Sequence, residues 1–305
     1  MIQTVLGPID EGDMGITLAH EHIMVGFIED GRLKAEDYDR AEVEEVMLLY
    51  LERLKDAGCG TLVECTPEYL GRDPELLRSL SRKSGLHLLT NTGFYQKPYL
   101  APSVYEMDEK EMGDIWIKEF QKGIGESGIK PGFIKIALNS GELLPLQKRI
   151  LAAALRTSEE TGLVIQAHTV GGEAILQAAE IIRGRGLDME RFIWVHADSE
   201  ADLTYHRRVG EQGMWIELDA IGTRPYEDHC RILALLLELG FEDQILISQD
   251  AGWYNIGQER GGQVRPYHPL LTEFVPFAQN WGIREEIFRK LLVLNPAKAF
   301  SIRGI

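Results

Sequence analysis

The sequence has few cysteines, a deficit of basic residues and no long apolar run. The three cysteines, Cys59, Cys65 and Cys230, are odd in number and lack C-x-x-C spacing, so they predict neither a disulfide framework nor a cysteine zinc site. Only 32 lysines and arginines stand against 48 acidic residues, and the net charge of -16 disfavours nucleic acid and anionic membranes as partners. The sequence shows no signal peptide and no run of about eighteen apolar residues. We therefore expect a cytoplasmic protein that does not bind membranes.

Motifs for nucleotide binding and for a serine nucleophile are also missing. The sequence contains neither a Walker A motif nor a G-x-S-x-G elbow. Residues 123–128 match G-x-G-x-x-G, but they follow a helical pattern and precede an apolar strand. A dinucleotide site needs the reverse order, so we expect only a turn there.

Eight short apolar or β-branched runs are present, separated by stretches with helical periodicity. The predicted strands cover residues 16–22, 61–65, 86–91, 133–136, 163–168, 192–196, 214–218 and 244–248. The clearest predicted helices cover residues 42–57, 146–161, 172–183 and 226–239. Alternation of strand and helix predicts a parallel sheet, and eight such units predict an α/β fold, a (β/α)8 TIM barrel. We expect residues 1–305 to form one domain.

Histidines stand at the carboxyl ends of three predicted strands, where such a barrel gathers its chemistry. His20 and His22 are two residues apart in a strand, so their imidazoles leave the same face. His168 and His196 each end a further strand, and Asp250 follows the eighth. A single buried histidine is usually a hydrogen-bonded core residue, but four of them with a carboxylate predict a metal site. Zinc suits these donors.

Lys135 lies inside an apolar predicted strand, where an unpaired ammonium is costly to bury. One interpretation is a structural lysine that reaches solvent or pairs with an acid. The other is that burial favours the neutral amine, which can capture carbon dioxide as a carbamate. The two oxygens of a carbamate can bridge two metal ions.

The chain resembles the phosphotriesterase family of the amidohydrolase superfamily from about Thr4 to Ser301. The resemblance is carried by residues 17–22, the Gly71-Arg72-Asp73 turn, residues 132–136, the two histidine-capped strands, Asp250 and Asn295-Pro296. It implies a (β/α)8 barrel with two divalent metals at the carboxyl ends of the strands. Carried over, His20, His22 and Asp250 would hold the more buried ion, His168 and His196 the more exposed one, and an N6-carboxylysine at Lys135 would bridge them. Zinc is the expected ion, with cobalt, manganese or iron as alternatives.

The resemblance implies a metal-dependent hydrolase in which Asp250 accepts a proton during catalysis. We expect a lactonase that opens a γ- or δ-lactone, a sugar lactone or a phosphorylated sugar lactone, with weak phosphotriesterase activity. A true aryldialkylphosphatase and a non-catalytic ligand-binding protein on the same scaffold remain open alternatives. Family members are often homodimers, and Tyr69 and Leu70 are candidates for such an interface.

Candidate substrate residues follow the third, seventh and eighth strands. Tyr95 stands where the lactonase branch carries a tyrosine, which would orient the lactone oxygen or assist the leaving group, or else serve as an aromatic wall. Asp219 is either a carboxylate that orients a metal ligand or a capping residue. Residues 251–269 read as a long loop that shapes the pocket. The remaining candidates are Arg224, Trp253, Arg260, Arg265 and Tyr267, the arginines as a clamp for phosphate or carboxylate.

Overall fold

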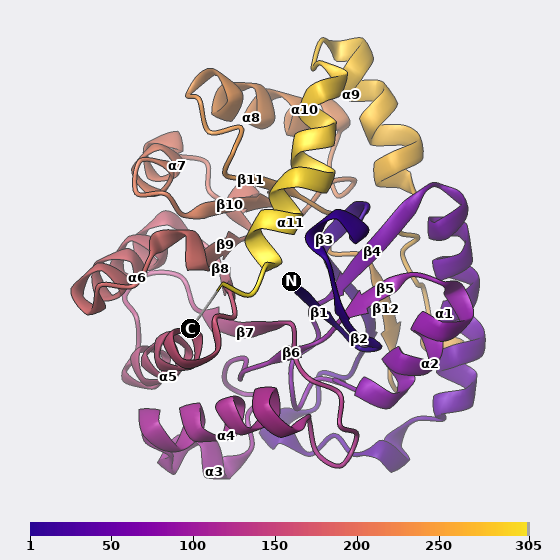
Figure 1. The fold of residues 1–305 in the computed structure, drawn as a ribbon, viewed down its shortest axis with the longest axis vertical. Coiled ribbons are helices and arrows are strands. Elements are labelled where there is room, and N and C mark those ends of the chain that lie inside the picture. The colour runs from indigo at the N-terminus through magenta and orange to yellow at the C-terminus, as the bar shows by residue number, and fades with distance from the viewer. Residues whose placement is uncertain (304–305) are drawn as a thin grey trace.

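A barrel of parallel strands forms the centre of the computed structural model, which describes residues 1–303 (Figure 1). Its strands are β3 (Ile16–Val25), β4 (Cys59–Glu64), β5 (His87–Leu89), β6 (Asn91–Thr92), β7 (Phe133–Leu138), β8 (Ile165–Thr169), β9 (Phe192–Val195), β10 (Trp215–Leu218) and β11 (Ile245–Ile247). Neighbours in chain order pair in parallel, except that β5 does not pair with β6. β5 pairs with β4 and β6 pairs with β7, so these two short strands together fill the third position of the barrel. The predicted (β/α)8 fold is confirmed.

The barrel closes between its first and eighth strands through irregular hydrogen bonds. The amide of Asp250 donates to the carbonyl of His20 at 3.1 Å, and the amide of His20 donates to Ser248 Oγ at 2.9 Å. The chain then continues into β12 (Gly252–Asn255), which pairs in parallel with the end of β3. Gly252 has a φ of 93°, and a Cβ there would lie 1.8 Å from the carbonyl oxygen of His22. Only glycine therefore permits this close approach of the two strands.

Helices surround the barrel (Figure 1). They are α1 (Arg40–Asp56), α2 (Pro74–Ser84), α3 (Pro102–Glu106), α4 (Glu109–Lys122), α5 (Pro145–Thr161), α6 (Gly172–Arg185), α7 (Leu203–Gly210), α8 (Tyr226–Glu238), α9 (Val275–Trp281), α10 (Glu285–Arg289) and α11 (Asn295–Phe300). One apolar cluster packs the helices onto the strands. A second fills the barrel interior and joins it to residues of both chain ends, including Ile2, Met14 and Phe300. The apolar cluster therefore fills the end of the barrel that the two chain termini cover. The carboxyl ends of the strands, at the other end of the barrel, are left for polar side chains.

The hairpin of β1 (Ile2–Thr4) and β2 (Gly7–Ile9) lies near the barrel axis in Figure 1. The sequence did not predict this hairpin or β12, so the expectation that residues 251–269 form one long loop is partly wrong. These strands are too short to show a clear alternation of apolar and polar residues, and their register is set by the segments with which they pair. No helix within residues 1–303 is long and apolar enough to cross a bilayer.

Candidate metal centre

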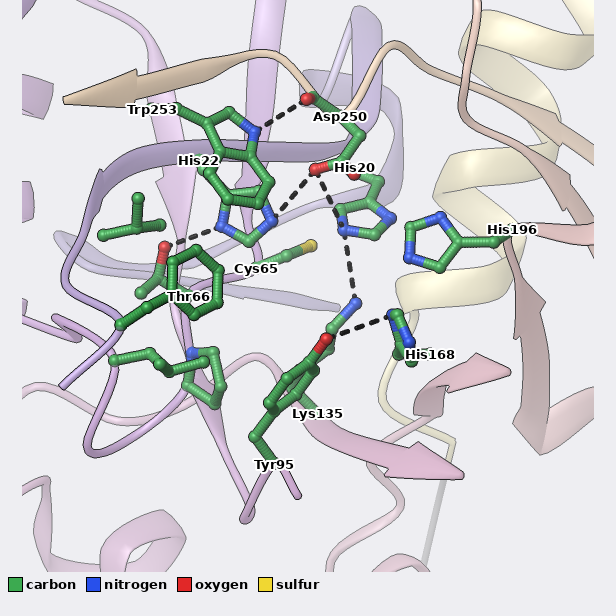
Figure 2. A pocket seen from close by; sticks show the side chains of 14 residues that line it. His20, His22, Cys65, Thr66, Tyr95, Lys135, His168, His196, Asp250 and Trp253 are labelled. Atoms are coloured by element: carbon green, nitrogen blue, oxygen red, sulfur yellow. Dashed lines mark hydrogen bonds and ion pairs between the residues drawn. The ribbon is translucent and has the colours of Figure 1, made fainter. Parts of the chain in front are cut away.

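The six predicted ligand side chains meet in one cavity at the carboxyl ends of the strands (Figure 2). Lys135 Nζ lies 3.3 Å from His20 Nε2, and Asp250 Oδ1 lies 3.1 Å from His22 Nε2. The rings of His168 and His196 are 4.5 Å apart between centroids. Residues from β3, β7 and β8 and from the turns after β9 and β11 thus converge from far apart in the sequence.

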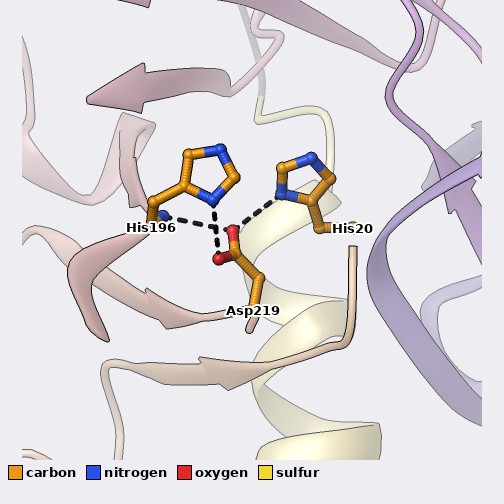
Figure 3. A group of neighbouring side chains, drawn as sticks. All are labelled: His20, His196 and Asp219. Carbon is orange, nitrogen blue, oxygen red and sulfur yellow. Dashed lines mark hydrogen bonds and ion pairs between the residues drawn. The ribbon is translucent and has the colours of Figure 1, made fainter. Parts of the chain in front are cut away.

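Asp219 orients two of the four histidines (Figure 3). Its Oδ2 lies 2.8 Å from His20 Nδ1, and its Oδ1 lies 2.8 Å from His196 Nδ1. A carboxylate only accepts hydrogen bonds, so both Nδ1 atoms carry a ring proton, and in the neutral form of each ring the lone pair is on Nε2. Of the two interpretations of Asp219, the structure favours the carboxylate that orients ligands. Although these three residues lie close enough to hold an ion, their facing atoms are already hydrogen-bonded to one another.

The other two histidines have hydroxyl partners. Thr66 Oγ1 lies 2.7 Å from His22 Nδ1, and the phenol of Tyr95 lies 3.3 Å from His168 Nδ1. Gly93 lets the chain carrying Tyr95 approach β7, since a Cβ at this position, with a φ of 117°, would lie 2.1 Å from the Lys135 carbonyl oxygen. Thr66 is a site residue that sequence reasoning missed, although its place just after β4 follows the same rule that found the histidines.

Burial and neighbouring charges keep the centre rich in electron-pair donors. Burial, with the nearby Lys135 ammonium, lowers the pKa of His20 to about 3. Burial likewise holds the pKa of His168 well below its usual range. Burial opposes ionisation of Asp250, but His20 and His22 outweigh it and lower the pKa of Asp250 to about 2. Burial also acts on His196, but Asp219 outweighs it and raises the pKa of that histidine. Neutral His20 and His168 beside the Asp250 carboxylate are in the protonation states that a metal site requires.

The donor set fits a divalent cation. His20, His22 and Asp250 offer ligand atoms that lie within 4.8 Å of one another. Asp250 Oδ1 is buried and accepts no hydrogen bond from any residue between 1 and 303. An acceptor oxygen and an imidazole lone pair therefore face each other without enough protons to satisfy both, and a cation resolves such an arrangement.

Lys135 is neither exposed nor paired with an acid. It is 2% exposed, and no carboxylate oxygen of the described chain lies within 4.0 Å of its Nζ. Its nearest polar neighbour is instead the Nε2 atom of His20. The structure therefore favours neither form of the structural interpretation, solvent access or an ion pair.

The wall of the cavity is mostly apolar or aromatic. Trp253 lines the cavity, with its ring centroid 4.8 Å from that of His22 and 5.6 Å from that of Phe27, on which it stacks. Leu70, expected at a dimer interface, is 3% exposed and lines this cavity, so it is not available for that interface. The wall residues are Val25, Phe27, Cys65, Thr66, Pro67, Leu70, Tyr95 and Trp253.

The three candidate arginines and Tyr267 are not among the residues that line the cavity. Arg224 donates to the carbonyl of Asp198 at 2.6 Å, and Arg265 donates to the carbonyl of Asp250 at 3.1 Å. Arg260 lies on the outside, paired with Glu45 of α1. Tyr267 is fully buried and donates to the carbonyl of His22 at 2.7 Å. The structure therefore does not bring together the expected clamp for phosphate.

Known proteins resemble this chain over nearly its whole length. A mutant PTE-like lactonase from Deinococcus radiodurans superposes with a TM-score of 0.90 at 30% identity, covering 99% of this chain and 100% of that one. The aryldialkylphosphatase of Saccharolobus solfataricus is 27% identical, covering 96% of this chain and 97% of that protein. The N-acetyltaurine hydrolase of Xenopus tropicalis is 25% identical, covering 99% and 98%. Residues 1–300 match the profile of the phosphotriesterase family, to which the chain therefore belongs.

Proposed function

We propose that the protein is a binuclear metal-dependent hydrolase whose substrate is a small neutral lactone with an apolar substituent. The observation that carries this proposal is a cavity in which six candidate ligands lie beneath an apolar and aromatic wall. Among the residues that line the cavity Lys135 is the one lysine or arginine, and it is itself a candidate ligand. A neutral substrate needs no further cation.

In this proposal His20, His22 and Asp250 would hold one ion and His168 and His196 the second, and Lys135, as its carbamate, would supply oxygen ligands to both. Imidazoles with carboxylate-type oxygens suit zinc, with cobalt, manganese or iron as alternatives. Two such ions supply a Lewis acid for the carbonyl oxygen and lower the pKa of an attacking water.

The chain's own residues then orient the substrate and move the proton. Asp250 would take the proton from the attacking water, since it lines the cavity and its Oδ1 accepts no hydrogen bond from the described residues. The Tyr95 phenol, partly buried beside His168, donates a hydrogen bond to the ring oxygen of the lactone. Trp253 and Phe27 cover the entrance and exclude bulk water from the reacting carbonyl.

The names of the relatives suggest other substrates, and the lining of the cavity suits some of them better than others. A neutral phosphotriester presents a polarised P=O to the same groups and is the second candidate, supported by the same lack of surrounding cations. N-acetyltaurine carries a sulfonate, and a phosphorylated sugar lactone carries a phosphate. Both anions call for an arginine or lysine partner, which the apolar wall does not offer.

A substrate panel tests the proposal. The protein, loaded with zinc, cobalt or manganese, is assayed with alkyl-substituted γ- and δ-lactones, an unsubstituted sugar lactone, a phosphorylated sugar lactone, paraoxon and N-acetyltaurine. We expect the highest kcat/KM for the alkyl-substituted lactones and weak turnover of paraoxon. Robust triester turnover without lactone turnover would refute the lactonase assignment. A metal-free protein that cannot be reconstituted, established by elemental analysis, would indicate a binding protein instead.

A further inference from the structure

Glu21 lies between His20 and His22 in β3 but points to the other face of the strand, into the seam between the first and eighth strands. It is fully buried. Its Oε1 accepts hydrogen bonds from Ser248 Oγ at 2.8 Å and from the amide of Gln249 at 3.1 Å. Its Oε2 accepts from the amide of Ala251 at 2.6 Å. Both carboxylate oxygens are therefore occupied by donors.

These bonds fix the backbone on both sides of Asp250. Gln249 and Ala251 flank it in sequence, and its own amide donates to the carbonyl of His20 at 3.1 Å. Three consecutive amides therefore bond to two adjacent residues of β3. Asp250 has a φ of 52°, in the left-handed region that a residue other than glycine adopts only where its surroundings hold it.

We propose that Glu21 is a positioning residue for Asp250, holding this turn so that the Asp250 carboxylate faces His22 Nε2. The inference rests on the proposed function in one respect, namely that Asp250 is a metal ligand. It assigns a role to the middle residue of the His-Glu-His tripeptide, which contacts neither cavity nor substrate. The same carboxylate closes the barrel between β3 and β11, so barrel closure and ligand geometry depend on one side chain.

A carboxylate is required because each oxygen meets an amide donor. In Glu21→Gln the side-chain NH2 must face the backbone amide of either Gln249 or Ala251. Both groups are donors, so the hydrogen bond at that position is lost. Glu64, at the end of β4, is a matched control. Its Oε1 accepts from the amides of Ile23 at 3.3 Å and Thr66 at 3.2 Å, whereas its Oε2 has no partner among the described residues. Glu64→Gln can place its NH2 at the free position and keep both bonds.

The test compares zinc binding with stability in the full-length protein. Wild type, Glu21→Gln and Glu64→Gln are dialysed against a series of chelator-buffered zinc concentrations, zinc per chain is determined by elemental analysis, and thermal unfolding is followed in the same buffers. We expect the free zinc concentration that half-saturates one of the two metal sites to rise about 10- to 100-fold in Glu21→Gln. It should stay within about twofold of wild type in Glu64→Gln, because the bonds of Glu64 are kept.

A purely structural Glu21 predicts a different result. Glu21→Gln would then unfold at lower temperature while binding both zinc ions as wild type does, and this outcome overturns the inference. An equal loss of zinc affinity in Glu64→Gln overturns it as well. If Glu21→Gln does not fold, Ser248→Ala removes one donor to Glu21 and the acceptor for the His20 amide, and unchanged zinc affinity in that variant also overturns the inference. Wild type that binds two zinc ions but hydrolyses no ester refutes the proposed function and leaves this result standing.

Discussion

Asn in place of Asp219 is expected to weaken metal binding without unfolding the protein. Asp219 accepts three hydrogen bonds, from His20 Nδ1 and His196 Nδ1 at 2.8 Å each and from the His196 amide at 3.1 Å. Asparagine has one acceptor oxygen, so its NH2 must face one of the two Nδ1–H groups. That histidine is then driven to the other tautomer, whose Nε2 carries the proton and cannot bind a metal. One ligand of the centre is lost, although the side chain keeps its shape.

The expected cost is about 10- to 100-fold in metal affinity, or about 1.4 to 2.7 kcal/mol at 1.36 kcal/mol per factor of ten. Isothermal titration of the chelator-treated protein with zinc measures it, and kcat for a lactone should fall in parallel at limiting zinc. Asp198→Asn is the control, since Asp198 Oδ2 accepts the Ala220 amide at 2.9 Å while its Oδ1 has no partner within residues 1–303. Wild-type zinc affinity in Asp219→Asn would show that the carboxylate does not set the tautomers.

Three further changes separate the bridge, the wall and a distant ion pair. Lys135→Ala should lose metal and activity together, with partial rescue by added short-chain carboxylic acids that supply bridging oxygens, and a fully metallated, active variant would refute the bridge. Phe27→Ala, at the half-exposed edge of the cavity, should raise KM for alkyl-substituted lactones by about three- to tenfold and leave KM for an unsubstituted lactone unchanged. Arg72→Met, which leaves the mostly buried Glu119 without its cation, should lower the free energy of unfolding by about 3 kcal/mol. Arg284→Met, whose partner Glu286 is exposed, should cost less than about 1 kcal/mol, as urea denaturation can check.

The strands could be predicted closely because their apolar runs are buried from both sides. The run predicted at 133–136 is observed as β7 (Phe133–Leu138), and the helix predicted at 172–183 as α6 (Gly172–Arg185). β12 was missed because its pairing is set by the approach of Gly252 to His22 and not by its own pattern. A contact between strands that are far apart in sequence leaves no local period to recognise.

The positions of the candidate ligands were predictable for a related reason, but their orientation was not. Parallel strands end at one edge, so a histidine that ends an apolar run points to the common mouth whatever the rest of the chain does. Which ring nitrogen faces inward depends on Asp219 for His20 and on Thr66 for His22. Sequence reasoning left Asp219 undecided between two interpretations and did not mention Thr66.

For the arginines the prediction was wrong because it relied on residue type and not on position in the fold. Arg224 and Arg265 follow the seventh and eighth strands and have the right chemistry for a phosphate, but backbone carbonyls already accept their guanidinium protons. Loop carbonyls near a barrel mouth need donors as much as a ligand does, and arginine, with five N–H groups, supplies them. Arg265 donates to the carbonyl of Asp250. Glu21, on the other side of the same turn, accepts hydrogen bonds from the amides of the two residues that flank Asp250. The turn that presents Asp250 is therefore fixed from both β3 and the loop before α9, which is why a side chain that never enters the cavity can control the metal centre.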